Sequence, residues 1–226
     1  MSALFLVATP IGNLKDITLR ALEVLNTSDY IICEDTRKTG ILLKHFNLKK
    51  TPLISFFESN EERKTPEILN LLNQGKNLVL VSNAGTPLIS DPGYKLVREC
   101  LKQKIKIESI PGPSALLTAL TLSGLPPDKF LFLGFLPKKP GKRRKILEGL
   151  KTIDENIKAT IIIYLSPYKL ITELNDLKNI FGDIEIVIAR ELTKVYQELR
   201  RETVSQAITH FETNKPKGEF VLLFRL

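Results

Sequence analysis

The sequence predicts two α/β domains, the first built on a mostly parallel sheet and the second on a mixed sheet. Up to residue 124, short apolar runs alternate with amphipathic stretches, as in chains whose strands and helices alternate. Four consecutive apolar residues at 78–81 indicate a central strand covered on both faces. Two prolines in the segment 124–128 then interrupt the pattern, since neither a helix nor an inner strand accommodates them. We therefore assign residues 1–124 and 129–226 to separate domains.

The first domain is expected to contain five strands, each followed by a helix. Asp16 or Thr18 caps the first helix, and the helix after the central strand takes Asp91 as its N-cap and Pro92 in its first turn. The strands are expected at residues 4–8, 30–33, 53–57, 78–81 and 105–110, and the helices at 19–25, 41–46, 68–72, 94–101 and 115–122.

In the second domain the expected strands outnumber the helices, which favours a mixed sheet. The strands are expected at 130–136, 160–165, 185–190, 195–203 and 219–225, and the helices at 142–153, 168–181 and 204–211.

Composition limits the class of protein. The 226 residues are 43% hydrophobic, which is enough for a packed core. No apolar run reaches membrane-spanning length and the N-terminal stretch lacks the basic lead of a signal peptide, so we expect a cytoplasmic protein without a membrane partner. Cys33 and Cys100 belong to no CxxC or Cys/His cluster, and no metal is expected. The net charge of +8 favours an anionic partner, with nucleic acid the leading candidate.

Missing motifs narrow the chemistry further. The chain has neither the dinucleotide fingerprint GxGxxG nor the phosphate loop GxxxxGK[ST]. Its two histidines, His45 and His210, leave little material for a Ser/His/Asp hydrolase or a histidine-ligated metal. What remains is a set of loops rich in glycine and proline at strand ends. The loop 82–87 carries small residues, so a ligand could approach its backbone closely.

Six motifs occur in the order of one known family over nearly the whole chain. They are Thr-Pro-Ile-Gly-Asn-Leu at 9–14, Glu-Asp-Thr-Arg at 34–37, Ala-Gly-Thr-Pro at 84–87 with Asp-Pro-Gly at 91–93, Pro-Gly-Pro-Ser-Ala at 111–115, Gly-Phe-Leu-Pro at 134–137 and Arg-Glu-Leu-Thr-Lys at 190–194. The series resembles the bacterial 16S ribosomal RNA 2'-O-ribose methyltransferase I family, within the tetrapyrrole methylase superfamily. The resemblance implies a tetrapyrrole methylase-like fold, S-adenosylmethionine in the cleft between two domains, and a homodimer. It also implies methylation of a cytidine ribose in the decoding region of 16S rRNA in the small ribosomal subunit.

The resemblance also implies which residues contact the cofactor. S-adenosylmethionine carries no phosphate, so its site needs acceptors near the sulfonium and donors for the carboxylate, both of which bare backbone supplies. For Leu165 and Leu192, plain core packing is an equally good interpretation. The cofactor contacts implied by the resemblance are Pro10, Asn83, Ala84, Gly85, Ile89, Ser114, Ala115, Leu165 and Leu192.

Departures from the family pattern bear on the mechanism. This chain has Asn83 where the family has aspartate, Tyr168-Lys169 where it has His-Arg, and Tyr196 where it has histidine. Histidine is therefore not the base at these positions, and alignment of the ribose hydroxyl is expected to supply most of the acceleration. The candidate catalytic residues are Asp35, Glu191 and Lys194, each of which also suits a structural ion pair.

A dense basic segment is expected to contact RNA phosphates, because it leads from a proline-rich loop into a helix and contains no acidic residue. The candidate RNA-binding residues are Arg37, Lys138, Lys139, Lys142, Arg143 and Arg144. Three alternatives stay open: a tetrapyrrole (corrinoid precursor) methylase, a diphthamide-type protein methylase, and a noncatalytic RNA-binding protein. The basic segment and the loop 34–37 argue against the first two, and measured methyl transfer would exclude the third.

Overall fold

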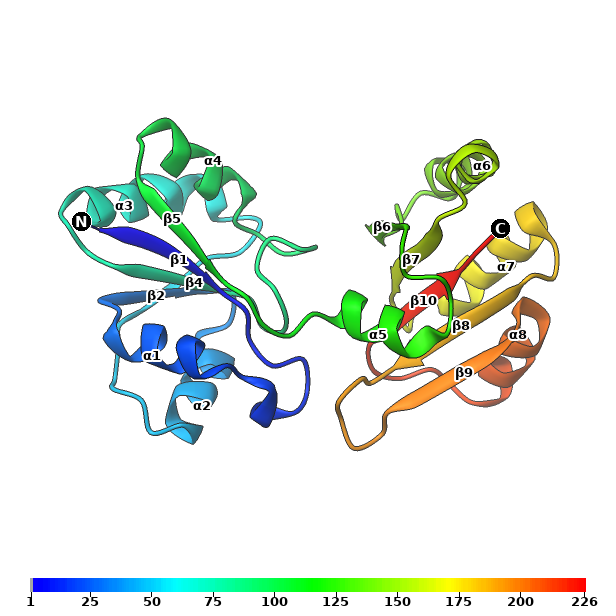
Figure 1. Ribbon diagram of the computed structural model, residues 1–226, viewed down its shortest axis with the longest axis horizontal. Helices are drawn as coiled ribbons and strands as arrows, with labels where there is room; N and C mark the ends of the chain where they lie inside the picture. Colours follow the sequence, from blue (N-terminus) through cyan, green and yellow to red (C-terminus); the bar gives the residue numbers. More distant parts are fainter. Residues whose placement is uncertain (1) are drawn as a thin grey trace. The chain divides into compact units, whose positions relative to one another are not determined.

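The chain forms two compact units, Met1–Ser114 and Ala115–Leu226 (Figure 1). This computed structural model describes residues 2–226, with residues 153–156 described by their backbone alone. The division falls before helix α5 (Ala115–Ser123), which contacts strands of the second unit. The sequence pattern places the boundary after this helix, at the prolines of residues 124–128.

The first unit is built on a five-stranded sheet in which every strand pair is parallel, where the sequence predicts a mostly parallel sheet. Its strand order is β3-β2-β4-β1-β5, so β4 and β1 lie inside the sheet. The strands are β1 (Ala3–Val7), β2 (Tyr30–Cys33), β3 (Leu53–Ser55), β4 (Leu78–Val81) and β5 (Lys106–Ile110).

Helices cover both faces of this sheet. Figure 1 shows α1 and α2 on one face and α3 and α4 on the other. Along β4, Leu78 and Leu80 belong to the core under α3 and α4, whereas Val79 and Val81 belong to the core under α1 and α2. This two-sided burial explains the unbroken apolar run of β4. The helices are α1 (Leu19–Thr27), α2 (Thr36–His45), α3 (Glu61–Asn73) and α4 (Tyr94–Lys102), with a 3-10 turn at Leu14–Asp16.

The second unit contains a mixed sheet, again as predicted. In the order β6-β7-β10-β8-β9, only the pair β6 and β7 is parallel. The strands are β6 (Phe130–Phe135), β7 (Thr160–Leu165), β8 (Glu185–Arg190), β9 (Glu198–Thr203) and β10 (Phe220–Phe224). The strand expected at 195–203 thus begins only at Glu198, and its first three residues belong to a loop.

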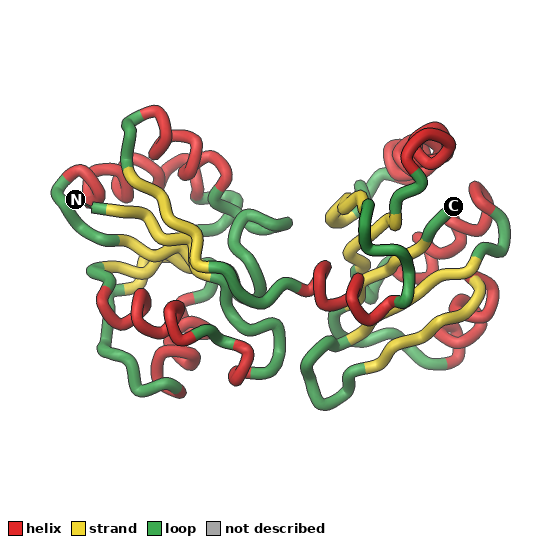
Figure 2. Tube along the Cα trace, in the orientation of Figure 1, coloured by secondary structure: helices red, strands yellow, loops and turns green. Residues whose placement is uncertain are grey.

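Three helices pack on one face of the second sheet, namely α6 (Pro140–Ile157), α7 (Leu170–Phe181) and α8 (Val204–Thr213). Leu222 of β10 belongs to the core beneath them. Its neighbours Val221 and Leu223 point to the opposite face and are also buried. Helix α5 contacts β10 and β8 and covers that face. Figure 2 shows the helices and strands of each unit by element type.

The start of α4 differs from the sequence-based expectation. The helix begins at Tyr94 and its N-cap is Gly93, so the prediction of Asp91 as N-cap and Pro92 in the first turn is wrong. Glu61 on α3 caps the helix instead, since its Oε1 accepts hydrogen bonds from the amides of Gly93 (3.2 Å) and Lys95 (3.1 Å). Asp91 therefore stays in the loop after β4, free for another role.

The other predicted N-cap is resolved in favour of Thr18, whose side chain accepts a hydrogen bond from the Ala21 amide at 3.1 Å. None of the helices in the described part of the chain is long and apolar enough to cross a membrane.

Candidate functional site

The loops after β1 and β4 are fastened to each other at the carboxyl edge of the first sheet. Thr9 and Gly85 exchange two backbone hydrogen bonds, each 2.9 Å long. The Thr9 hydroxyl also donates to the Ser82 carbonyl at 3.2 Å. Gly85 has a φ of 81°, a conformation that favours glycine, which explains why this residue type stands at the contact. The two loops therefore hold a fixed spacing.

Two further loops join the same edge. The Thr86 hydroxyl donates to the Pro113 carbonyl in the loop after β5 at 3.1 Å. The backbone amide of Asn83 donates to Glu34 Oε1, in the loop after β2, at 3.2 Å. Four strand ends thus contribute to one cluster of loops, which is where open α/β sheets bind ligands.

Six of the predicted cofactor contacts belong to these loops of the first unit: Pro10, Asn83, Ala84, Gly85, Ile89 and Ser114. Ile89 is 39% exposed and stands between Leu88 and Ser90, whose φ angles are 72° and 64°. Two left-handed residues on either side of one exposed apolar side chain indicate a strained loop, a feature that occurs often at functional sites.

The remaining predicted contacts lie in the second unit. Ala115 opens α5, Leu165 ends β7 and Leu192 follows β8. Leu165 and Leu192 are only 2% and 6% exposed, and Leu165 belongs to the core cluster. Packing accounts for Leu165 without a ligand.

Asp35 is the N-cap of α2, where it holds Arg37. Its Oδ1 accepts hydrogen bonds from the Arg37 backbone amide at 2.9 Å and from Arg37 Nε at 3.1 Å. Its Oδ2 accepts a hydrogen bond from Arg37 Nη2 at 2.8 Å. These bonds to Arg37 lower the pKa of Asp35 to about 2. A carboxylate with so low a pKa is a weak proton acceptor, so its geometry favours a positioning role.

Glu191 and Lys194 form an ion-pair cluster with Glu219 in the second unit. Lys194 Nζ lies 2.8 Å from Glu191 Oε1 and 2.9 Å from Glu219 Oε2. Burial disfavours both charges, but the hydrogen bonds of the cluster prevail, lowering the pKa of Glu191 and raising the pKa of Lys194. Both side chains therefore stay ionised at neutral pH and hold the loop after β8.

Asp91 is the functional candidate that the sequence pattern concealed. Burial, together with the nearby charge of Glu34, raises the pKa of Asp91 to about 7, although a hydrogen bond with the Ser82 side chain acts in the opposite direction. A carboxyl group that titrates near neutral pH is suited to accept a proton. The Asp-Pro pair imitates a helix start, so local pattern alone could not single it out.

The basic segment divides into exposed and buried charges. Lys138, Lys139 and Lys142 are exposed. Arg143 is only 2% exposed, and its guanidinium pairs with Asp176 on α7, with Nε 2.6 Å from Oδ2. Its Nη1 also donates to the carbonyls of Pro137 and Lys138. Arg143 therefore holds the segment in place. The sequence predicts that it contacts RNA, but its charge is buried and does not face solvent.

The neighbouring Arg144 is paired as well. Its Nε lies 2.8 Å from Asp176 Oδ1, but its side chain is 56% exposed. Arg37 is exposed over 87% of its side chain despite its bonds to Asp35. Both guanidinium groups therefore remain accessible from the solvent side.

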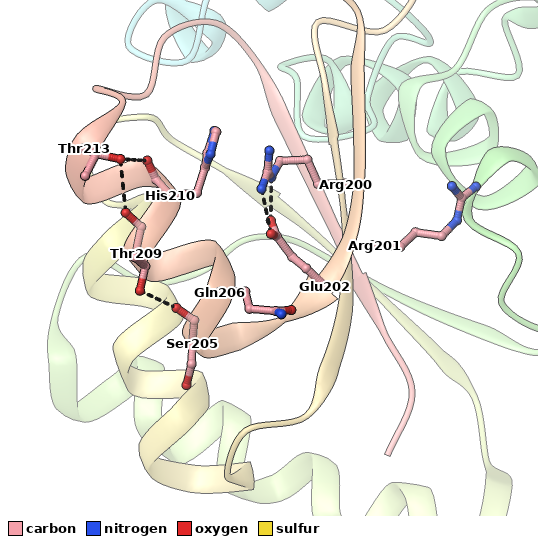
Figure 3. Close-up of a pocket in the computed structure, with 8 residues that line it drawn as sticks. All are labelled: Arg200, Arg201, Glu202, Ser205, Gln206, Thr209, His210 and Thr213. Carbon is pink, nitrogen blue, oxygen red and sulfur yellow. Dashed lines mark hydrogen bonds and ion pairs between the residues drawn. The ribbon is translucent and has the colours of Figure 1, made fainter.

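An open hollow of about 630 Å³ lies between β9 and α8 (Figure 3). Arg200 lies on its wall and donates to Glu202 Oε1 and Oε2 at 2.5 and 2.7 Å. Arg201 turns away toward α5, where it donates to the carbonyls of Leu122 and Ser123. The arginines of the hollow are thus already neutralised or satisfied, and none of the predicted site residues lines it.

Comparison with known proteins identifies the family. The family model of the tetrapyrrole (corrin/porphyrin) methylases matches residues 3–208. A ribosomal RNA small subunit methyltransferase I from Thermotoga maritima is 50% identical over 224 residues, covering 99% of this chain and 98% of the relative. The chain belongs to the ribosomal RNA small subunit methyltransferase I family. A second member, from Synechocystis, is 47% identical and is matched over 99% of this chain and 78% of its own length.

Solved structures show that this methyltransferase has the tetrapyrrole methylase fold. A diphthine synthase aligns with a TM-score of 0.74 at 16% identity, over 99% of this chain and 90% of its own. A cobalt precorrin-4 methyltransferase of cobalamin biosynthesis aligns with a TM-score of 0.72 at 18% identity, over 98% and 94%. At such low identity the agreement concerns the fold alone, because enzymes that act on different substrates can share one fold.

Proposed function

We propose that this chain transfers a methyl group from S-adenosylmethionine to the ribose 2'-hydroxyl of a cytidine in the decoding region of 16S rRNA. The observation that carries the proposal is the 50% identity to a small subunit rRNA methyltransferase I over nearly the full length of both chains. The cluster of loops at the carboxyl edge of the first sheet supports it, because it coincides with the family motifs.

The chemistry of these loops suits the cofactor. In the segment 83–86, the backbone amide of Asn83 and both backbone groups of Gly85 are hydrogen-bonded within the protein and hold the loop in shape, and Glu34 and Asp91 provide negative charge suited to a sulfonium. A Cβ at Gly85 would meet Ile11 Cγ2 at 3.4 Å, so the loop is already closely packed on one side. We propose cofactor contacts at Pro10, Asn83, Ala84, Gly85, Ile89, Ser114, Ala115, Leu165 and Leu192, of which Leu165 has the strongest alternative explanation in packing.

In the proposed mechanism, S-adenosylmethionine would supply a methyl carbon bonded to a sulfonium sulfur. The bond from the ribose oxygen to this carbon would form as the carbon–sulfur bond breaks, and the sulfur would leave as the thioether S-adenosylhomocysteine. The chain's own task is to orient the ribose and to accept the hydroxyl proton. Asp91 is the carboxyl group at this edge best suited to accept it, because its pKa lies near 7. Asp35 places Arg37 toward solvent, and Glu191 with Lys194 fixes the loop after β8. Of the three catalytic candidates predicted from the sequence, Asp35, Glu191 and Lys194, we therefore propose each as a positioning residue.

RNA contacts are proposed at Arg37, Lys138, Lys139, Lys142 and Arg144, whose side chains reach solvent. Arg143 is left out because it is buried against Asp176. We further propose that the protein acts in the cytoplasm as a homodimer, as the family resemblance implies. Sedimentation at several protein concentrations would test the dimer directly.

The decisive experiment incubates the protein with methyl-labelled S-adenosylmethionine and small subunits that lack the modification, followed by mapping of the label. We expect label on one cytidine ribose. Label on a base, or transfer to a corrinoid precursor and not to the subunit, would contradict the proposal. Label on protein would contradict it as well.

A further inference from the structure

Four loops meet at one edge of the second sheet. Phe220 of β10 pairs with Leu165 at the end of β7 and with Arg190 at the end of β8. On β6, Phe135 pairs with Tyr164 and so ends at nearly the same level. The segments after β6, β7 and β8 and the segment before β10 therefore share this edge, which we call the loop edge. It comprises residues 136–139, 166–169, 191–197 and 214–219.

The loop edge carries unusually exposed large side chains. Tyr168 is 94% exposed and Tyr196 is 76% exposed, while Val195 beside it is 93% exposed. Only β10 separates β7 from β8, so the loops carrying the two tyrosines leave the sheet about 10 Å apart. Two aromatic side chains extended from neighbouring loops form a surface suited to a partner with flat apolar groups.

The loop bearing Tyr196 is held in one shape before any partner arrives. Glu191 and Thr193 adopt φ angles of 49° and 65°, and Lys194 bridges Glu191 to Glu219. The Thr193 amide donates to Gln197 Oε1 at 2.6 Å. The turn bearing Tyr168 is closed by a hydrogen bond of 3.0 Å from the Lys169 amide to the Ser166 carbonyl. Both tyrosines therefore project from preorganised supports, which limits the entropy lost on binding.

The charge of the loop edge selects an anionic partner. Its segments contain six lysines and two glutamates, and both glutamates are bridged by Lys194. Lys138 and Lys139 take part in no ion pair within the described residues. The six lysines are Lys138, Lys139, Lys169, Lys194, Lys215 and Lys217. A polyanion that exposes aromatic faces satisfies both properties, and single-stranded RNA is such a partner, whereas a duplex hides its base faces.

We infer that the loop edge binds single-stranded RNA, with Tyr168 and Tyr196 each stacking on an unpaired base and the lysines contacting phosphates. The inference rests on the proposed function for the source of the RNA, which is the strand around the modified nucleotide. It adds two residues that lie outside the six motifs on which the resemblance rests.

The test measures RNA binding without methyl transfer. The probe is a single-stranded RNA of about 12 nucleotides, compared with a duplex of the same length. Tyr168→Leu and Tyr196→Leu remove the ring but keep apolar bulk, and Tyr168→Phe and Tyr196→Phe keep the ring. Leu101→Ala, an equally simple change at a 62% exposed side chain of α4, is the control. Since the chain has five tyrosines and no tryptophan, tyrosine emission also reports stacking.

Each Leu variant should weaken single-strand binding by roughly 5- to 150-fold. The Phe variants and Leu101→Ala should bind as the wild type does, duplex binding should stay unchanged, and RNA should quench tyrosine emission less in the Leu variants. Equal single-strand affinity of wild type and both Leu variants would overturn the inference. Unchanged affinity with a loss of dimer would show that the tyrosines cover a second copy, which also overturns it.

A parallel assay of methyl transfer by the wild type separates this inference from the proposed function. Absence of transfer to small subunits would refute the proposed function, while the binding comparison would still decide on stacking.

Discussion

Thr9 and Gly85 exchange both backbone hydrogen bonds at 2.9 Å, and this two-residue bridge joins the loops of two adjacent parallel strands. A Cβ on Gly85 would already be in van der Waals contact with Ile11 Cγ2, at 3.4 Å, so a larger side chain would have to find space beyond that contact. The positive φ of Gly85 adds a second constraint. Both constraints lead to a direct test of the loop.

Gly85→Val should weaken S-adenosylmethionine binding by at least about tenfold and cost about 1–2 kcal/mol of stability from the left-handed backbone. Gly75→Val is the matched control, because Gly75 has a φ of 88° and nothing within 4 Å of its Cβ position. It should lose similar stability and keep its affinity. Calorimetric titration and thermal unfolding measure the two quantities, and equal affinity in both variants would remove this loop from the site.

Asn83→Asp should change cofactor affinity by no more than about tenfold, or ~1.4 kcal/mol. The Asn83 amide already donates to Glu34, and this backbone bond survives the substitution. Titration calorimetry gives the affinity, and steady-state kinetics give the turnover. A gain in turnover well beyond tenfold would show that the asparagine weakens the enzyme.

Methyl transfer should increase as the pH rises through about 7, because the proposed acceptor Asp91 must lose its proton first. Asp91→Asn should lower the rate by about 10²- to 10⁴-fold and remove this ionisation from the pH profile. Single-turnover rates with saturating substrate measure the effect. An unchanged profile in the variant would assign the ionisation to another group.

Stability should show the opposite dependence on pH. The folded-state pKa of Asp91 is raised, so its contribution to stability is fully present below the unfolded pKa and is lost as the pH rises through about 7. Buried Glu173, whose pKa burial also raises to about 7, adds the same trend. Asp91→Asn and Glu173→Gln should each reduce the slope by up to about 1.4 kcal/mol per pH unit. Denaturant unfolding between pH 5 and pH 8 would measure these slopes.

Replacing Lys138, Lys139 and Lys142 by glutamine should weaken binding to small subunits and flatten its salt dependence by about 0.9 per lost phosphate contact. Cofactor affinity should stay the same. A triple replacement of Lys102, Lys104 and Lys106, also exposed, removes the same charge elsewhere and serves as the control. Equal salt slopes in the two triple variants would mean that the segment contributes only net charge.

Arg143→Met should destabilise the protein by about 3–5 kcal/mol, because it leaves Asp176 buried beside a single remaining partner. Arg144→Gln should cost less than about 1 kcal/mol, since that side chain is 56% exposed. Denaturant unfolding distinguishes the two. Equal small losses would show that the buried pair contributes little to the fold.

The alternation of elements was predictable because each strand and helix of the first unit carries its own local signal. The apolar run of β4 implies burial on two faces, and the small residues that follow it mark a strand end. The order in which strands pair was not predictable in this way. The position of β4 between β2 and β1 involves packing against helices on both faces of the sheet, and such contacts join residues far apart in sequence.

The candidate site was predictable where its residues belong to loop motifs. It was less predictable where a side chain distant in sequence determines where a helix begins or whether a charge is buried. The pattern of Asp91 and Pro92 satisfies local rules for a helix start, but Glu61 on α3 supplies the cap and moves the start to Tyr94. In the same way Arg143 looks like its exposed neighbours in sequence. Only its pairing with Asp176, 33 residues away, makes it structural.

Strand β10 sets the level at which the loops of Tyr168 and Tyr196 leave the sheet, because Phe220 pairs with Leu165 of β7 on one side and with Arg190 of β8 on the other. Inserting one residue into β7 would lengthen the strand by about 3.4 Å and would also turn every later side chain of β7 to the opposite face, moving Leu165 out of the core. Evolution of this surface would therefore be constrained in the length and register of β7 and β8 as well as in side-chain identity.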